Sequence, residues 1–160
     1  MGRDKARVRL GRRTLLGHVR RTAESVGAEV RVIRKDRVPR CGPLGGIYTG
    51  LKTSAHEAEV FLSCDMPFLT PALLTHLMEA RPPAFVEQNR TVGFPLIVSV
   101  VDLGVVEEEM RAQRFSLQNL AKRLKARCLP VREREGRQLF NMNTPADWRE
   151  AQLRLAELPL

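Results

Sequence analysis

Asp65 directly follows an apolar stretch, within the segment FLSCDMPFLTP that runs from Phe61 to Pro71. The preceding residues are typical of a buried strand, and ligands of parallel α/β sheets bind beyond the carboxyl ends of the strands. Carboxylate oxygens are ligands that Mg²⁺ prefers. We therefore interpret Asp65 as a candidate magnesium ligand, and the capping of a turn before Pro67 is the alternative.

A glycine-rich turn precedes that strand, in the sequence CGPLGGIYTG. Glycines at positions 42, 45, 46 and 50, together with Pro43, describe a turn without side-chain bulk that leads into a helix N-terminus. The backbone of such a turn can approach a ligand closely. A purely structural role is an equally open interpretation of this turn.

Two asparagines lie one residue apart in the segment NMNTPAD, at Asn141 and Asn143. In extended backbone both amides face the same side, just before a helix that Thr144 can cap. Two short hydrogen-bonding side chains suit the recognition of a polar ligand. The alternative is that both asparagines only form a turn, which is their common role.

Helix-like and strand-like segments alternate along the chain without repeats or linkers, and they must position these side chains. Apolar spacing and capping residues predict helices over 14–27, 47–53, 102–113, 116–126 and 145–158 and one that begins at Pro71, and strands over 28–33, 58–64, 84–88 and 93–101. This alternation implies parallel strands. We predict one α/β domain over residues 1–160, with a mostly parallel sheet.

Composition predicts a soluble cytoplasmic protein. No apolar run approaches the roughly 20 residues of a membrane-spanning helix, so no membrane partner is expected, and the basic start lacks the apolar region of a secretory signal. Cys41, Cys64 and Cys128 lie far apart, which predicts free thiols in a reducing compartment.

The formal net charge of +9 is carried mostly by arginine. Such an excess is typical of proteins that bind nucleic acid or phosphate-rich small molecules. The arginines are scattered between acids, and aromatic residues make up only 5% of the chain, so stacking platforms for bases are few. We predict no nucleic-acid partner; a nucleic-acid binder would instead show a steep salt dependence of binding.

Several motifs occur in a fixed order along the whole chain: Met1-Gly2-Arg3-Asp4-Lys5, Asp36 upstream of Gly42-Pro43-Leu44-Gly45-Gly46, Cys64-Asp65-Met66-Pro67, Phe94-Pro95-Leu96, and Asn141 to Asp147. This series resembles the molybdenum cofactor guanylyltransferase family, nucleotidyltransferases that make molybdopterin guanine dinucleotide. The resemblance implies a three-layer α/β/α Rossmann-like domain, with Mg²⁺ as cofactor and with GTP and molybdopterin as substrates.

The resemblance also implies roles for single residues. Lys5 and Asp65 would be catalytic, with Lys5 on the nucleotide phosphates and Asp65 on the metal. The remaining implied contacts are Asp36 and Gly42 for the guanosine nucleotide and Pro95, Asn141 and Asn143 for the pterin substrate. Alternatives stay open for two of these residues: Lys5 as an ordinary exposed lysine, and Asp36 as the opening residue of the turn KDRVP.

Nucleotidyl transfer needs charge neutralisation, because an anionic phosphate attacks an anionic α-phosphorus. A carboxylate-held Mg²⁺ and a lysine supply it, and positioning supplies most of the rest, so no covalent intermediate is needed. Cys41 and Cys64 therefore need no catalytic role.

The chain departs from the family pattern at its start, because Met1 lies inside the signature LAGGxSxRMGxDK. We expect the family's first strand and glycine loop to be missing, and either an in-frame coding extension upstream of Met1 or an impaired product. The alternatives are a cytidylyltransferase or sugar-phosphate nucleotidyltransferase, or a degenerate domain that binds a partner without catalysis. We expect a monomer, with molybdoenzymes or cofactor-biosynthesis proteins as protein partners.

Overall fold

The computed structural model describes residues 5–157, with side chains throughout except at positions 133 and 134. The chain forms two compact units, each built from separate stretches of sequence. The first, here called the terminal unit, contains the described residues up to Val30, Leu62–Leu74 and those from Glu133 onward. The second, here called the sheet unit, contains Arg31–Phe61 and Thr75–Arg132. The prediction of a single domain over 1–160 stays a prediction.

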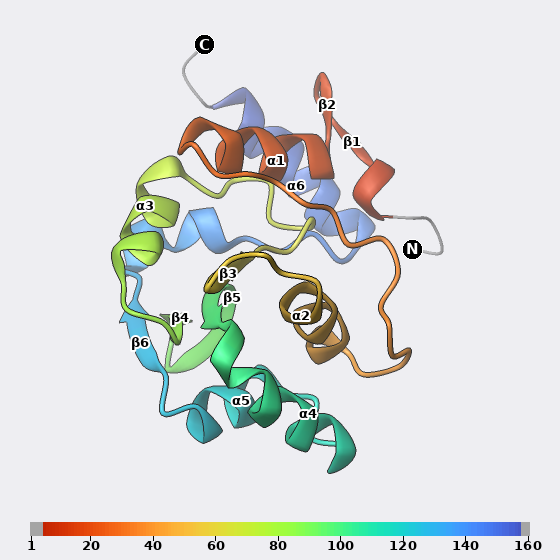
Figure 1. Ribbon diagram of the computed structural model, residues 1–160. Helices are drawn as coiled ribbons and strands as arrows, with labels where there is room; N and C mark the ends of the chain where they lie inside the picture. Colours follow the sequence, from red (N-terminus) through yellow and green to blue (C-terminus); the bar gives the residue numbers. More distant parts are fainter. Residues whose placement is uncertain (1–4, 158–160) are drawn as a thin grey trace. The chain divides into compact units, whose positions relative to one another are not determined.

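The sheet unit is built on a four-stranded sheet (Figure 1). The strands lie in the order β3 (Ala58–Phe61), β5 (Thr91–Ser99), β4 (Ala84–Gln88) and β6 (Arg127–Pro130). β5 pairs with both of its neighbours in antiparallel sense, whereas β4 and β6 pair in parallel. The predicted α/β class is confirmed.

The prediction of a mostly parallel sheet is wrong for the described strands. β4 and β5 are joined by only two residues, Asn89 and Arg90, both with positive φ, at 51° and 62°. Such a connection makes a tight hairpin of the type I′ class, which forces the two strands to be antiparallel. The prediction had placed the two strands as separate members of an alternating α/β series.

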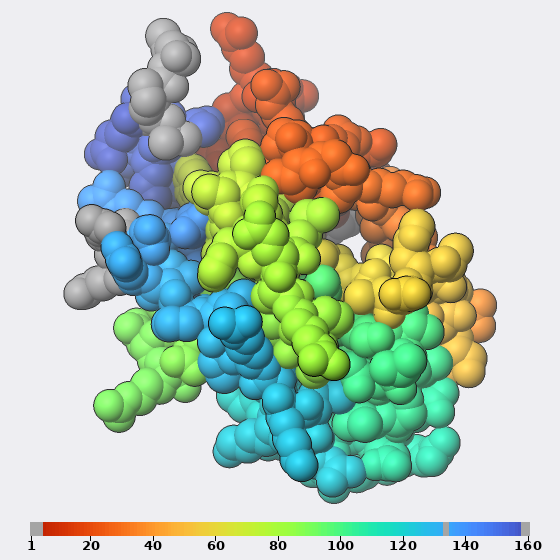
Figure 2. Space-filling view, turned by 60° about the vertical axis from the view of Figure 1, so that its left-hand side comes forward, coloured from red at the N-terminus to blue at the C-terminus, as the bar shows by residue number. Residues whose placement is uncertain are grey.

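Three helices pack with this sheet to form the larger core. They are α2 (Pro43–Lys52), α4 (Leu103–Arg111), which follows the short helix η2 (Val100–Asp102), and α5 (Leu117–Arg123). The buried side chains of this core are Leu44, Ile47, Leu51, Phe61, Phe85, Val92, Leu96, Val98, Val106, Leu120 and Ala121. Figure 2 shows α4 and α5 side by side on the surface of this unit.

A buried carboxylate joins α4 to the segment that follows it. The Glu109 side chain is fully buried and accepts two hydrogen bonds from Arg114, from Nε at 2.9 Å and from Nη2 at 2.6 Å. Arg123 of α5 lies 3.2 Å from the same carboxylate. Hydrogen bonds from Arg114 hold the pKa of Glu109 below its usual value, against the opposing effect of burial. The ion cluster therefore fastens α4 to α5.

The terminal unit contains the two ends of the described chain. Its elements are η1 (Lys5–Arg7), β1 (Arg9–Leu10), β2 (Arg13–Thr14), α1 (Leu15–Ser25), η3 (Glu133–Leu139) and α6 (Pro145–Ala156). Leu10, Leu15, Met142 and Ala151 form its core. The indole Nε1 of Trp148 donates to the Arg9 carbonyl oxygen at 3.0 Å and ties α6 to β1. The helix α3 (Pro71–Glu79) begins in this unit and ends in the other.

The predicted helices are confirmed, and α2 begins four residues earlier than expected, at Pro43. Thr70 caps α3, since its Oγ1 accepts from the Leu73 N–H at 3.3 Å. The strand predicted over 28–33 is wrong, because this segment has no strand pairing in the structure. Among the described residues, no helix is long and apolar enough to cross a membrane.

Candidate functional site

Three of the predicted site residues meet in the terminal unit and are here called the lysine group. Lys5 Nζ donates to the Asn143 amide oxygen Oδ1 at 2.6 Å. The same ammonium nitrogen lies 3.9 Å from Asp65 Oδ2. The side chains of Lys5 and Asp65 are 35% and 17% exposed, so both reach solvent while most of their surface is covered. A cation, a carboxylate and an amide therefore face one another at the surface.

Asp65 is fixed through both its side chain and its main chain. Ser63 Oγ donates to Asp65 Oδ1 at 2.6 Å. The Met142 N–H donates to the Asp65 carbonyl oxygen at 2.9 Å. The second carboxylate oxygen, Oδ2, is the one that faces Lys5. Asp65 thus holds one oxygen in a local hydrogen bond and presents the other toward the cation.

Asn143 is positioned by the N-terminus of α6. Thr144 and Asp147 form a capping box, in which the Thr144 hydroxyl accepts from the Asp147 N–H at 3.1 Å. Asp147 Oδ2 accepts in return from the backbone N–H groups of Thr144, at 2.7 Å, and Asn143, at 2.8 Å. These backbone hydrogen bonds lower the pKa of Asp147, and the bond from Asn143 has the largest effect. The cap therefore fixes the backbone that carries the Asn143 amide.

The two asparagines alternate with a buried residue. Asn141 and Asn143 are exposed, and Met142 between them is fully buried. This alternation agrees with the expectation that both amides lie on one side of an extended segment. Only Asn143 is brought to Lys5 by a hydrogen bond.

The lysine group is suited to bind a metal ion that is coordinated partly by the protein and partly by a bound phosphate ligand. Among the described side chains, no three histidine, cysteine, aspartate or glutamate residues are grouped closely enough to enclose a metal ion. Asp65 offers one carboxylate with an oxygen directed away from its local hydrogen bond. Mg²⁺ is commonly held by one or two carboxylates together with substrate phosphates. These residues therefore fit a magnesium ion that is bound jointly with a phosphate ligand.

Asp36 lies in the sheet unit, against the first turn of α2. A Cβ atom added at Gly45 would lie 2.7 Å from Asp36 Oδ2 and 3.2 Å from the Val38 carbonyl oxygen. Because Gly45 has no side chain, the Asp36 carboxylate can pack against the helix at this position. A negative charge near the N-terminus of a helix is favourable, because the helix dipole is positive there. The sequence had indicated Asp36 and this turn separately, and the structure brings them together.

Gly42 and Pro95 have structural roles that are visible in the same unit. Gly42 precedes α2 with φ 52° and ψ −141°, a conformation that favours glycine over any other residue. Pro95 is buried in the middle of β5. The motif residues before Lys5, which the resemblance had also matched, lie outside the described residues.

Three residues that hold the site were not predicted from the sequence. Ser63, which bonds Asp65, lies two positions before it and belongs to the local turn signal. Thr49, which bonds the backbone beside Asp36, is an ordinary residue in a helix. Arg31, which bonds the end of α2, is one arginine among many. A single sequence gives no signal for the roles of Thr49 and Arg31.

The sequence and the fold both match known proteins. A family model described as MobA-like NTP transferase domain matches residues 1–128. A probable molybdenum cofactor guanylyltransferase of Flavobacterium johnsoniae is 29% identical, over 72% of this chain and 63% of that protein, so the match spans less than two thirds of the relative's length. A protein of the same description from Pelotomaculum thermopropionicum is 27% identical, over 92% of this chain and 83% of that protein.

The fold has a close counterpart among solved structures. The crystal structure of molybdopterin-guanine dinucleotide biosynthesis protein A from Archaeoglobus fulgidus superposes with a TM-score of 0.75 at 20% identity. The match covers 98% of this chain and 93% of that one. It confirms a shared α/β fold.

Proposed function

Because the chain belongs to the family of MobA-like NTP transferase domains, we propose that it transfers GMP from GTP to molybdopterin and so makes molybdopterin guanine dinucleotide. The chain is an enzyme of the nucleotidyltransferase type. The two relatives named above are each described as a probable molybdenum cofactor guanylyltransferase, which supports guanine as the base and molybdopterin as the acceptor.

The proposed reaction is a single displacement at phosphorus. A phosphate oxygen of molybdopterin attacks the α-phosphorus of GTP, and the bond from that phosphorus to the bridging oxygen of the β-phosphate breaks. Pyrophosphate leaves with the bonding electron pair. Both reactants are anions, so the protein must neutralise and orient them before they can meet.

The observation that carries this proposal is the lysine group. A lysine ammonium has three N–H donors, and the Asn143 amide oxygen accepts one of them. The others are available for phosphate oxygens, because Lys5 is partly exposed. Lys5 would thus bind and orient the nucleotide phosphates while Asn143 sets the direction of its side chain.

Asp65 would hold Mg²⁺ through the carboxylate oxygen that faces Lys5. The metal, when bound, would neutralise phosphate charge and align the phosphate groups. Asp65 is already oriented for this role by Ser63 and by its main-chain bond from Met142. Little conformational freedom would be lost when the site is loaded.

The remaining predicted contacts are proposals as well. Asp36, held against α2, would accept hydrogen bonds from the guanosine, and Gly42 would let the backbone approach the nucleotide. Asn141 and Asn143 would face the pterin substrate. Pro95, which is buried in β5, would act by shaping the strand rather than by direct contact.

We also propose that the enzyme is a cytoplasmic monomer that delivers its product to molybdoenzymes or cofactor-biosynthesis proteins. No described cysteine is in a disulfide, which is compatible with a reducing compartment. Size-exclusion chromatography with light scattering would test the monomer.

An assay of the full chain with GTP, MgCl₂ and molybdopterin tests the function. We expect release of pyrophosphate that depends on both the metal and molybdopterin, together with the dinucleotide product in the mass spectrum. CTP in place of GTP is the matched control, and it should give little product. Faster transfer from CTP would contradict guanine as the base, and absence of transfer from both nucleotides would contradict the proposed activity.

A further inference from the structure

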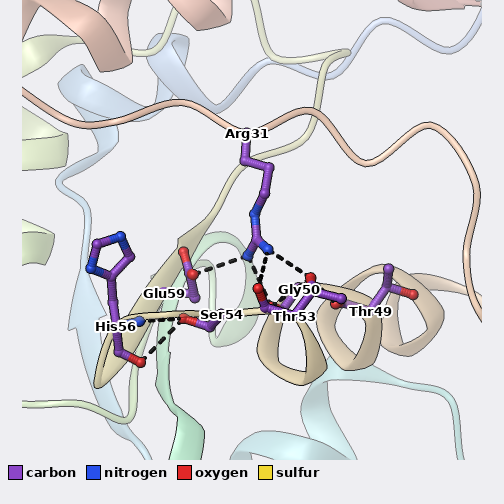
Figure 3. Close-up of polar contacts among 7 residues, drawn as sticks. All are labelled: Arg31, Thr49, Gly50, Thr53, Ser54, His56 and Glu59. Carbon is purple, nitrogen blue, oxygen red and sulfur yellow. Dashed lines mark hydrogen bonds and ion pairs between the residues drawn. The ribbon is translucent and has the colours of Figure 1, made fainter.

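Arg31 connects the segment before Asp36 to the C-terminal end of α2 (Figure 3). Its Nη1 donates to the carbonyl oxygen of Thr53 at 2.7 Å and to the Thr53 hydroxyl at 2.6 Å. Its Nη2 donates to the carbonyl oxygen of Gly50 at 2.9 Å and to Glu59 Oε1 of β3 at 3.0 Å. One guanidinium group therefore joins three parts of the sheet unit.

These contacts suit an arginine for a physical reason. The last carbonyl groups of a helix have no partner within the helix, and the helix dipole is negative at this end. A cation that donates to the carbonyl of Gly50 in the last turn and to the carbonyl of the cap residue Thr53 is favourable there. The planar fork of a guanidinium group presents several N–H donors in fixed directions, so it can bond the helix end and a carboxylate at the same time. The arrangement fixes the direction in which the chain leaves Arg31.

A second attachment lies six residues further along the chain. The Thr49 hydroxyl accepts a hydrogen bond from the Arg37 backbone N–H at 2.9 Å. The same hydroxyl donates to the Gly45 carbonyl oxygen at 2.8 Å, one turn earlier in α2. Thr49 is 8% exposed, so this bond is largely shielded from water. Its hydroxyl proton is committed to Gly45, which leaves an oxygen lone pair to hold Arg37.

Asp36 lies between these two attachments, next to Arg37. The segment from Arg31 runs along α2 closely enough that Ile33 Cδ1 lies 3.3 Å from where a Cβ of Gly50 would be. At the other end of the helix, Asp36 lies against Gly45. The short segment 31–37 is thus fixed along α2 at both ends, and the Asp36 carboxylate is fixed with it.

We propose that Arg31 and Thr49 are positioning residues that hold Asp36 in place to receive the nucleoside. This inference rests on the proposed function, in which Asp36 binds the guanosine of GTP. A carboxylate that is already in place binds its ligand more tightly than one on a free loop, because less conformational entropy is lost on binding. Arg31 and Thr49 would touch no substrate and would act through Asp36.

Substitutions in the full chain test this inference against a purely structural role. Thr49→Val removes the hydroxyl at nearly constant shape, Thr49→Ser retains it, and Arg31→Ala removes the other attachment. Arg34→Ala is the matched control for Arg31→Ala, because it removes the same charge from an exposed position in the same segment. Calorimetric titration with GTP in MgCl₂ and with inorganic tripolyphosphate separates contacts to the nucleoside from contacts to the phosphates.

We expect Thr49→Val and Arg31→Ala to weaken GTP binding about tenfold, which corresponds to one or two lost hydrogen bonds. Binding of tripolyphosphate should not change, and Thr49→Ser and Arg34→Ala should resemble the parent protein. In NMR hydrogen exchange, the Arg37 amide should be protected in the parent protein and in Thr49→Ser, and should exchange faster in Thr49→Val. A purely structural role would weaken the binding of both ligands in proportion to the loss of stability.

The Asp36→Asn background identifies which proposal fails. If Thr49 acts through Asp36, Thr49→Val should cause no further loss of GTP affinity in that background. Weak GTP binding in Asp36→Asn with unchanged binding in Thr49→Val would overturn the positioning inference alone. Unchanged Arg37 exchange in Thr49→Val would overturn it as well, whatever the ligand. Unchanged GTP binding in Asp36→Asn would overturn the guanosine role of Asp36 and the inference that rests on it.

Discussion

The Lys5 ammonium and the Asn143 amide oxygen are 2.6 Å apart, although 138 positions separate them in the chain. This contact joins a residue at the start of the described chain to the capping box of α6. In the proposed reaction the first residue serves the nucleotide and the second the pterin. The two substrates would therefore be recognised by side chains that already touch each other.

A double-mutant cycle on this pair should show coupling. Lys5→Met should weaken GTP binding about tenfold, since it removes a charge-assisted contact to phosphate. Asn143→Ala should weaken it less, because it only frees the Lys5 side chain. If Asn143 acts on GTP through Lys5, the two effects should differ from additivity by about 1 kcal/mol. Additive effects in titrations without molybdopterin would refute the coupling.

Asp65→Asn should keep the fold and lose most of the Mg²⁺-dependent transfer. The amide is nearly isosteric with the carboxylate, but a neutral oxygen binds a hard cation poorly. Asparagine also caps turns about as well as aspartate, so a turn cap would survive the change. The measurements are the melting temperature and guanylyl transfer to molybdopterin, with Asp102→Asn as a control for the loss of one carboxylate elsewhere. Full guanylyl transfer by the Asp65→Asn variant would contradict the role of Asp65 as a metal ligand.

Two neighbouring glycines of α2 offer a paired test of the Asp36 position. Gly46→Ala has space, because its Cβ would lie 3.8 Å from the nearest atom, Asp36 Oδ1. It should raise the free energy of unfolding by up to about 1 kcal/mol through helix propensity. Gly45→Ala would push against the Asp36 carboxylate and should weaken GTP binding with little gain in stability. Urea denaturation and GTP titration of both variants check this, and equal GTP affinities would contradict it.

Acid should destabilise the protein partly through Glu109. The folded pKa of this carboxyl is lowered, so its contribution to stability is complete above the unfolded pKa of about 4.3. That contribution is lost as the pH falls through the folded value. Glu109→Gln should cost about 2 kcal/mol at neutral pH, less than a fully buried pair because both arginines reach solvent. Urea denaturation at a series of pH values should give a flatter dependence for Glu109→Gln, and an equal slope would argue against the ion cluster.

GTP with Mg²⁺ should raise the melting temperature more than CTP with Mg²⁺. A ligand that binds only the folded state stabilises it by mass action, in proportion to the logarithm of its concentration over Kd. Differential scanning fluorimetry at matched nucleotide concentrations is sufficient. Asp36→Asn should reduce the difference between the two nucleotides. A larger shift with CTP would favour the cytidylyl alternative.

Local signals predicted the helices well, because their ends are fixed by residues close in sequence. Thr70 and Thr144 each precede a proline and accept a hydrogen bond from the first turn. Strand pairing depends on residues far apart in sequence, and the pairing sense was predicted incorrectly. The Asn89-Arg90 turn lacks the glycine that usually marks such a hairpin, so the sequence had no strong signal for it.

The residues of the lysine group were predicted, but their proximity could not be. Spacing along the chain says nothing about distance between Lys5, Asp65 and Asn143, and it was the resemblance to a family that linked them. The prediction of a strand over 28–33 was wrong for another reason. Its alternation of polar and apolar residues is typical of a strand, yet Arg31 bonds the end of a helix and Ile33 lies beside Gly50. A half-buried extended segment has the same pattern whether or not it pairs.

The division of the chain into two interrupted units has a consequence for synthesis on the ribosome. Every residue of the sheet unit has been translated once Arg132 is complete, whereas the terminal unit still lacks η3 and α6. The hydrogen bond between Lys5 and Asn143 therefore cannot form until Asn143 has left the exit tunnel. Domains generally fold as units in the order of synthesis, so the sheet unit can begin to fold before the terminal unit is complete. The contact between Lys5 and Asn143 in the lysine group can therefore form only after the whole of the sheet unit has been synthesised.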